Sequence, residues 1–492
     1  MSKYSKYLKY GVALNIVLVL ICGASPNWLD AQNERIFRAG ASESNITPWL
    51  GLPIVGNWGT PLANHIHDDL FSKCLVLDDG KTRLVYVLID NVGVPQWVYD
   101  KAKDVLFEKT GIPKEQVLMA AVHNHSAVSA GGQGRKRKGY SVNEPLDDYQ
   151  KFLISRIVDG VLVAINRLEP AKIGWGSVDV PQFLFNRRYF MKEPVINPFG
   201  GKDLVQMNPR AKDPNIEKPA GPIDPEVAFI SVQSIDERPI AVLANYSLHY
   251  VGGVPRGHIS GDYFAVFADR IQELLGADRQ DPPFVGIMSN GTSADVNSSD
   301  KIGETEKYAA YEKMKVVGDE VAESVYKVYN EITHHSWVEL KVKHSELTLK
   351  IRRGNPEMFN NIQKVLNRSK SEGPLFHRLE RNYAKRVMQM SLEWPDEIKV
   401  VLQTFQIGDL GIAAIPFEVF TETGLELKAK SPFDLTFTIE IANGYYGYLP
   451  TPEQHDLGGY ETWMSTNLVE KEASVKIVEE LMEHFTSMKE MD

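Results

Sequence analysis

The residues of this chain best suited to chemistry are a few histidines and one acid that lie far apart in sequence. His123 and His125 flank an asparagine in "MAAVHNHSAVSAGG" (residues 119–132), His249 lies in "NYSLHYVGG", and Glu418 lies in "IPFEVFTETG". A catalytic zinc ion takes neutral imidazole nitrogens and a carboxylate oxygen and keeps one position open for water or substrate. His123 or His125, together with His249 and Glu418, supplies such a set, although no compact motif such as H-E-x-x-H joins them.

Each of these residues also has an ordinary structural interpretation. In a continuing strand His123 and His125, two residues apart, would point to the same face, so both could reach one site, or they could be two ordinary histidines at the end of a surface strand. The small residues and glycines that follow predict a turn there. His249 could be a core histidine with satisfied hydrogen bonds, and Glu418 could cap the helix that begins beside it.

The elements that must position these side chains follow from hydrophobic periodicity. Apolar, β-branched runs alternate with helical patterns, which is typical of an α/β fold with a largely parallel or mixed sheet and flanking helices. The stretch 186–226, rich in Pro, Lys, Asn and Gly, predicts a long surface excursion. The expected strands are 83–89, 116–122, 239–248, 284–289, 410–415 and 435–442, and the expected helices are 96–109, 146–168, 262–275, 305–332, 376–391 and 467–487.

Polar residues able to bind a metal or a substrate follow six of these strands. Ligands of open α/β sheets bind at the carboxyl ends of strands, so a metal site is expected at that edge. The residues concerned are Asp90, His123 with His125, His249, the segment 290–297, Glu418 and Asn443 with the tyrosines after it.

Composition and the N-terminus limit the class and location of the protein. A net charge of -10 over 492 residues argues against general nucleic-acid binding. Three lysines precede a short apolar run, which predicts a signal peptide over residues 1–32 and export to a secreted or periplasmic location. One domain is expected over 33–492, and its single cysteine, Cys74, excludes an internal disulfide.

Five segments in order resemble the motifs of the neutral/alkaline ceramidase family, over roughly residues 40–465: "VHNHSAVSAGG", "NYSLHYVGG", "MSNGTSADVN", "IPFEVFTETG" and "NGYYGYLPTPEQHDLGGYE". The resemblance implies a zinc-dependent hydrolase that cleaves a linear amide (N-acyl) bond of a small-molecule or lipid-like substrate, with at most a membrane-surface association. It implies zinc ligands and catalytic residues at these positions: His123, His249, Glu418 and Tyr448 for the metal, and His125, Tyr460 and Arg187 for catalysis.

One position departs from the family pattern. Ceramidases carry G-D-x-S-P-N, whereas this chain reads "SADVNSSD", with Asn297 in place of the serine. Asp295 and Asn297 are therefore expected to bind a substrate other than ceramide. Two alternatives stay open: a zinc hydrolase acting on a saccharide derivative, for which the basic stretch "GGQGRKRKG" (131–139) suits an anionic group, and a binding protein on the same fold without turnover.

Overall fold

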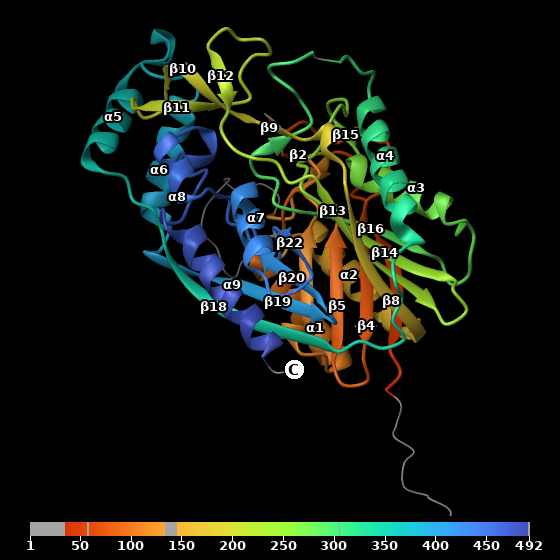
Figure 1. Cartoon of the computed structure of the whole chain (residues 1–492). Helices are drawn as coiled ribbons and strands as arrows, with labels where there is room; N and C mark the ends of the chain where they lie inside the picture. Colours follow the sequence, from red (N-terminus) through yellow and green to blue (C-terminus); the bar gives the residue numbers. More distant parts are fainter. Residues whose placement is uncertain (1–34, 57–58, 133–144, 305, 491–492) are drawn as a thin grey trace, which may run out of the picture. The chain divides into compact units, whose positions relative to one another are not determined.

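The computed structural model describes residues 35–56, 59–132, 145–304 and 306–490 (Figure 1). The predicted signal peptide and most of the basic stretch 131–139 lie outside the described residues. Residues 36–492 form one compact unit, which contains every element discussed below. In the part of the chain that the structure describes, no helix is both long and apolar enough to span a bilayer.

The larger sheet of this unit is mixed. It has eight strands in the order β16-β14-β13-β8-β1-β4-β5-β6. The pairs β14–β16 and β5–β6 at its two edges are parallel, and the other neighbours are antiparallel. The mixed alternative is thus confirmed, and the sheet is not largely parallel. The strands are β1 (Arg38–Asn45), β4 (Phe71–Asp78), β5 (Arg83–Ile89), β6 (Val117–Ala121), β8 (Glu169–Asp179), β13 (Glu226–Ser234), β14 (Pro239–Tyr246) and β16 (Val285–Asn290).

A second, four-stranded sheet packs against the first. Its order is β18-β19-β20-β22, and only its last pair, β20–β22, is parallel. One apolar core joins the two sheets; in it the rings of Tyr86 and Phe405 lie 5.2 Å apart. The strands are β18 (Leu340–Lys350), β19 (Glu397–Ile407), β20 (Leu410–Ile415) and β22 (Leu435–Glu440).

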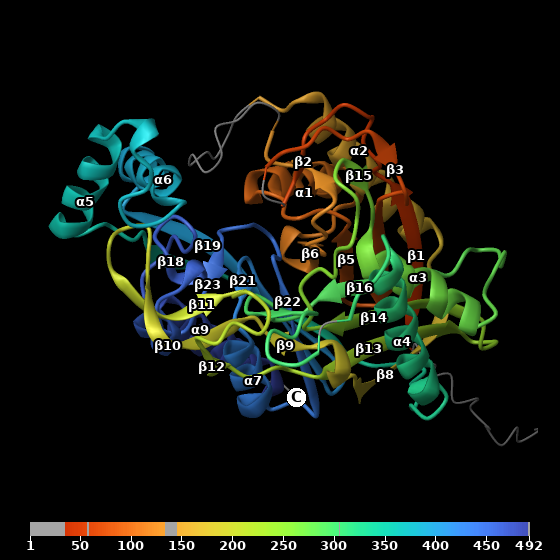
Figure 2. The same cartoon turned by 90° about the horizontal axis from the view of Figure 1, so that it is seen from above.

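Helices cover the outer faces of both sheets, and Figure 2 shows α1 and α2 on the side opposite α7 and α9. The six predicted helices are present: α1 (Gln96–Thr110), α2 (Asp148–Asn166), α3 (Asp262–Leu274), α4 (Glu312–Tyr329), α6 (Glu380–Glu393) and α9 (Ala473–Lys489). The fourth begins at Glu312, several residues later than expected. The other helices are shorter: α7 (Thr421–Lys430), which begins beside Glu418 as expected, and the unpredicted α5 (Pro356–Asn367) and α8 (Pro452–Leu457).

The stretch 186–226 is more ordered than a surface excursion. It contains β10 (Arg188–Ile196), β11 (Lys202–Met207) and β12 (Ile216–Pro219), which form a small antiparallel sheet. Just before it, β9 (Phe185–Asn186) pairs with β17 (Val296–Asn297). Arg187, between β9 and β10, is 5 % exposed. Much of the surface of these strands faces solvent. Their sequence is therefore polar, and it does not show the apolar pattern that predicts a strand.

Candidate metal centre

The chain turns at His123, immediately after β6. His123 has a left-handed φ of 70°, and its backbone N–H donates to Asn91 O at 2.9 Å. The turn directs the ring inward, where Nδ1 lies 2.6 Å from Val92 O. A carbonyl oxygen only accepts hydrogen bonds, so Nδ1 carries the proton and Nε2 presents a lone pair.

His249 lies after the end of β14 and is held in the same way. Its Nδ1 is 3.2 Å from Ser293 O, another acceptor, so its Nε2 also presents a lone pair. The Nε2 atoms of His123 and His249 are 3.1 Å apart. Two lone pairs at this distance repel each other unless a cation lies between them. With zinc–nitrogen bonds of about 2.0–2.1 Å, tetrahedral ligand atoms lie roughly 3.3–3.4 Å apart, close to this separation.

Glu418 supplies a carboxylate to the same point. It begins β21 (Glu418–Val419), just after β20, and is 1 % exposed. Its Oε2 lies 3.5 Å from His123 Nε2 and 3.9 Å from His249 Nε2, and it accepts no hydrogen bond from a described residue. Burial raises its pKa, but positive charge at the position of His123 and the hydroxyls of Tyr445 and Tyr448 outweigh burial and lower the pKa below 4.5. A bound cation beside a neutral His123 would supply that positive charge and keep the group ionised. An ionised buried oxygen beside two lone-pair nitrogens fits a divalent cation.

His125 also reaches this group, since its Nε2 is 3.1 Å from that of His123. One ring nitrogen from each of His123, His125 and His249 can be chosen so that all three lie within 4.8 Å of one another. The His125 ring stacks on Tyr250, with centroids 3.8 Å apart. Burial, followed by the charge of neighbouring groups, lowers the pKa of both His125 and His249 well below 6.5, so both imidazoles are neutral. By distance alone, His125 belongs with the metal-competent histidines.

Two tyrosines flank Glu418, and the sequence predicts one of them as a ligand. Tyr448, the predicted ligand, is the parallel strand partner of Glu418, and its hydroxyl accepts from Arg187 Nη2 at 3.0 Å. Tyr445 was missed, yet its hydroxyl donates to Glu418 Oε1 at 2.6 Å. The cluster "NGYYGY" was a signal for more than one site tyrosine, but it did not show which rings face inward.

The predicted catalytic residues Arg187 and Tyr460 lie beside this group. Arg187 Nε donates to Glu461 Oε1 at 3.1 Å, and Arg188 Nη1 donates to Glu461 Oε2 at 2.7 Å. Glu461, which was not predicted, therefore orients two buried cations. The ring of Tyr460 is 5.8 Å from that of Tyr448, and burial raises the Tyr460 pKa to about 12. Its hydroxyl is thus protonated and can donate a hydrogen bond.

The two predicted substrate-binding residues differ in placement. Asp295 is fully buried; Oδ1 accepts from the backbone and hydroxyl of Thr421 at 2.9 and 2.8 Å, and Oδ2 from Asn186 at 2.8 Å. These contacts connect α7 to β9 and leave Asp295 facing protein rather than solvent. Asn297 is partly exposed, and its amide donates to the side chain of Asn208.

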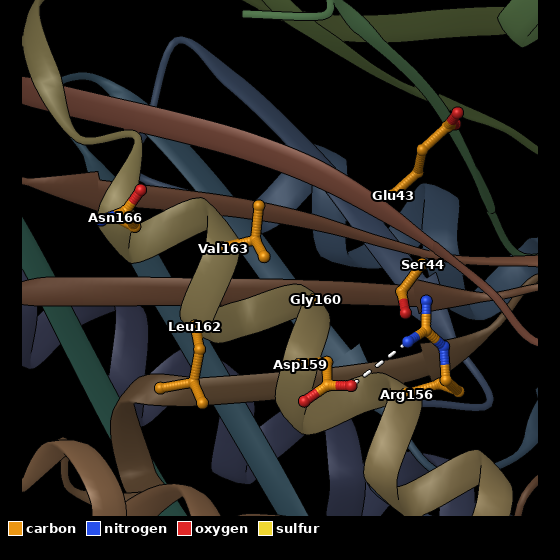
Figure 3. A pocket seen from close by; sticks show the side chains of 8 residues that line it. All are labelled: Glu43, Ser44, Arg156, Asp159, Gly160, Leu162, Val163 and Asn166. Atoms are coloured by element: carbon orange, nitrogen blue, oxygen red, sulfur yellow. Dashed lines mark hydrogen bonds and ion pairs between the residues drawn. The ribbon is translucent and has the colours of Figure 1, made fainter.

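A separate depression lies between α2 and β1 (Figure 3). Its cation, Arg156, pairs with Asp159 at 3.2 Å and also donates to Asn45 O at 3.1 Å. None of the predicted site residues lines this depression, and the residues that do include no histidine. It offers no metal-binding set.

The fold has counterparts among solved structures, although no protein-family model matches the sequence. Neutral ceramidase from Pseudomonas aeruginosa is similar over 93% of this chain and 75% of its own, with a TM-score of 0.67 and 16% identity. A ceramidase complexed with C2 is similar over 93% and 76%, with a TM-score of 0.66 and 16% identity. The resemblance to neutral ceramidases is therefore confirmed at the level of the fold.

Proposed function

We propose that this protein is an exported zinc-dependent hydrolase that cleaves a linear amide bond of a small, N-acylated substrate. The observation that carries the proposal is the convergence of His123 Nε2, His249 Nε2 and Glu418 Oε2, three buried atoms with lone pairs and mutual distances of 3.1–3.9 Å. The ceramidase fold supports the choice of an amide as the scissile bond.

The ligands of the ion would be His123, His249 and Glu418, with Tyr448 as the fourth. Bound zinc would lower the pKa of water to about 7 and polarise the substrate carbonyl. The chain's own part is orientation. Carbonyl oxygens hold both Nδ1 protons in place, and the hydroxyl of Tyr445 fixes the Glu418 carboxylate. Such outer contacts set the direction and basicity of the ligand atoms.

His125, Tyr460 and Arg187 would act on the substrate. The protonated phenol of Tyr460 is suited to donate to the oxygen of the tetrahedral species, and one well-placed donor contributes roughly 2.7–4 kcal/mol. His125, neutral and partly exposed, is suited to carry a proton to the leaving nitrogen. Arg187 is fixed by Glu461 and is suited to hold a polar group of the substrate.

A second candidate substrate, an acylated saccharide, is favoured by Asn297. This partly exposed amide is hydrogen-bonded to Asn208, and it lies two residues from Asp295, whose carbonyl accepts from the Arg187 N–H at 2.7 Å. Amides pair well with hydroxyl-rich groups. A lipid chain that covers an amide without replacing the hydrogen bonds it makes to water costs roughly 1–3 kcal/mol per group. We therefore expect a polar group near the scissile bond.

The test compares hydrolysis by chelator-treated and zinc-reconstituted protein on a panel of ceramides, short N-acyl amino compounds, N-acylated sugars and esterified sugars. We expect turnover only after reconstitution, and faster turnover of the polar N-acyl compounds than of ceramides. Equal rates with and without zinc would contradict metal dependence. Zinc binding without turnover of any panel member would favour the binding-protein alternative, and turnover restricted to sugar esters would favour the saccharide alternative.

A further inference from the structure

Glu440 is a fully buried carboxyl group next to the metal centre. It is the last residue of β22 and pairs in register with Ile415, three residues before Glu418. Its Oε2 accepts from the backbone N–H of Val419 at 2.6 Å, and its Oε1 accepts from the Ser293 hydroxyl at 2.7 Å. Glu440 thus binds Val419, which follows the ligand candidate Glu418, and Ser293, which contacts the ligand candidate His249.

Ser293 connects this carboxyl group to His249. Both the carbonyl and the hydroxyl oxygen of Ser293 lie near His249 Nδ1, at 3.2 and 3.3 Å. The Ser293 hydroxyl uses its proton toward Glu440, so its oxygen faces the imidazole as an acceptor. The accepting carboxyl oxygen at the end of this chain of contacts therefore favours a proton on Nδ1 and a lone pair on Nε2.

Packing does not explain why an acid stands here. Glu440 is 0 % exposed, and the charged group that acts on it most is Glu418, which is also acidic. Burying a carboxyl group costs free energy unless it is paired or hydrogen-bonded, and an amide or apolar side chain of similar size would avoid that cost. A dication held by His249 and Glu418 would offset that cost.

We propose that Glu440 is a positioning residue of the metal centre, acting through Ser293 on His249 and through Val419 on Glu418. The proposal rests on the proposed function only in requiring that the site binds zinc. Glu440 touches neither substrate nor metal. It connects β22 to β21 and to the segment that follows β16, so that the donor atoms of Glu418 and His249 are correctly directed.

The Glu440→Gln variant separates the two contacts. Its amide oxygen can still accept from Val419, but the amide nitrogen then faces the Ser293 hydroxyl as a donor and reverses its polarity. Ser293→Ala removes the hydroxyl and keeps the backbone carbonyl that His249 contacts. Asp79→Asn is the matched control because Asp79 is also 0 % exposed and accepts backbone N–H bonds from Lys81, Thr82 and Leu340, away from the metal centre.

The measurement is the zinc dissociation constant of each full-length variant, obtained by competition with a chromophoric chelator, together with the visible spectrum after cobalt substitution. We expect Glu440→Gln to bind zinc about 10–100-fold more weakly, with an altered cobalt spectrum. Ser293→Ala should weaken binding in the same direction, and the double variant should be no weaker than the poorer single variant. Asp79→Asn should lower the melting temperature alone.

Wild-type zinc affinity in Glu440→Gln, or additive losses in the double variant, would overturn the proposal. If Glu440→Gln does not fold, Ser293→Ala decides, because it removes only a hydroxyl group. Absence of zinc binding by the wild-type protein would instead contradict the proposed function, so the two failures are distinguishable.

Discussion

The Tyr445→Phe substitution should weaken zinc binding while leaving the fold intact. The lost hydroxyl donates to Glu418 Oε1 at 2.6 Å, and Glu418 is ionised and 1 % exposed. A hydrogen bond to a charged group contributes about 1.5–3 kcal/mol. Because 1.4 kcal/mol corresponds to a factor of ten, the zinc dissociation constant should rise by roughly 10–100-fold. The Phe ring fills the same volume, so the loss reports the hydroxyl group alone.

The matched control is Tyr446→Phe. Tyr446 is the next residue, is half-buried, and donates to the neutral amide oxygen of Gln96 at 2.7 Å. Its hydroxyl should contribute about 0.5–1.5 kcal/mol to the free energy of unfolding and nothing to zinc affinity. Chelator competition gives the affinity, and urea denaturation gives the stability. Equal zinc affinities for wild type and Tyr445→Phe would refute the idea that this phenol orients the carboxylate.

Three further predictions concern catalysis, stability and specificity. His125→Ala and Tyr460→Phe should each keep about one zinc ion per chain and lower kcat with little change in KM; loss of zinc from His125→Ala would make His125 a ligand. Burial lowers the pKa of Lys103, which donates to Asn443, to about 8. Its unfolded pKa is about 10.4, so between these pH values the unfolded chain binds the extra proton. Urea denaturation gives the free energies of unfolding of wild type and Lys103→Met. Between about pH 8 and about pH 10.4 the stability of wild type relative to Lys103→Met should therefore rise by about 1.4 kcal/mol per pH unit. A difference that does not change with pH would contradict the lowered pKa. Asn297→Ser should raise ceramide hydrolysis by at least about tenfold if this residue sets specificity, and unchanged rates would remove it from the substrate site.

The elements with uniform burial could be predicted from sequence. The strands 83–89 and 410–415 were placed to the residue because they are continuous apolar runs. The strands β1 (RAGASESN) and β8 (EPAKIGWGSVD) were missed because they consist largely of small, polar and charged residues; in β1 the small residues are themselves buried. These strands lie in the middle of the larger sheet and pair antiparallel with their neighbours.

The residues of the candidate metal centre also divide into those that the sequence predicts and those that it does not. His123, His249 and Glu418 could be identified because each follows a recognisable strand. Tyr445, Glu440 and Ser293 could not, since their roles depend on hydrogen bonds between segments distant in sequence. Asp295 illustrates the converse: its place in a resembling motif suggested substrate binding, whereas its contacts are with Thr421 and Asn186 inside the protein.

Metal content tests the central claim most directly. The purified protein, equilibrated with zinc and then desalted, should retain one zinc ion per chain, as measured by elemental mass spectrometry. The His123→Ala/His249→Ala double variant should retain none, because two of the three converging lone pairs are gone. His484→Ala is the control, since His484 is a buried histidine of α9, outside the metal-competent histidine group, and it should retain the wild-type amount. Stoichiometric zinc in the double variant would contradict the assignment of this metal centre.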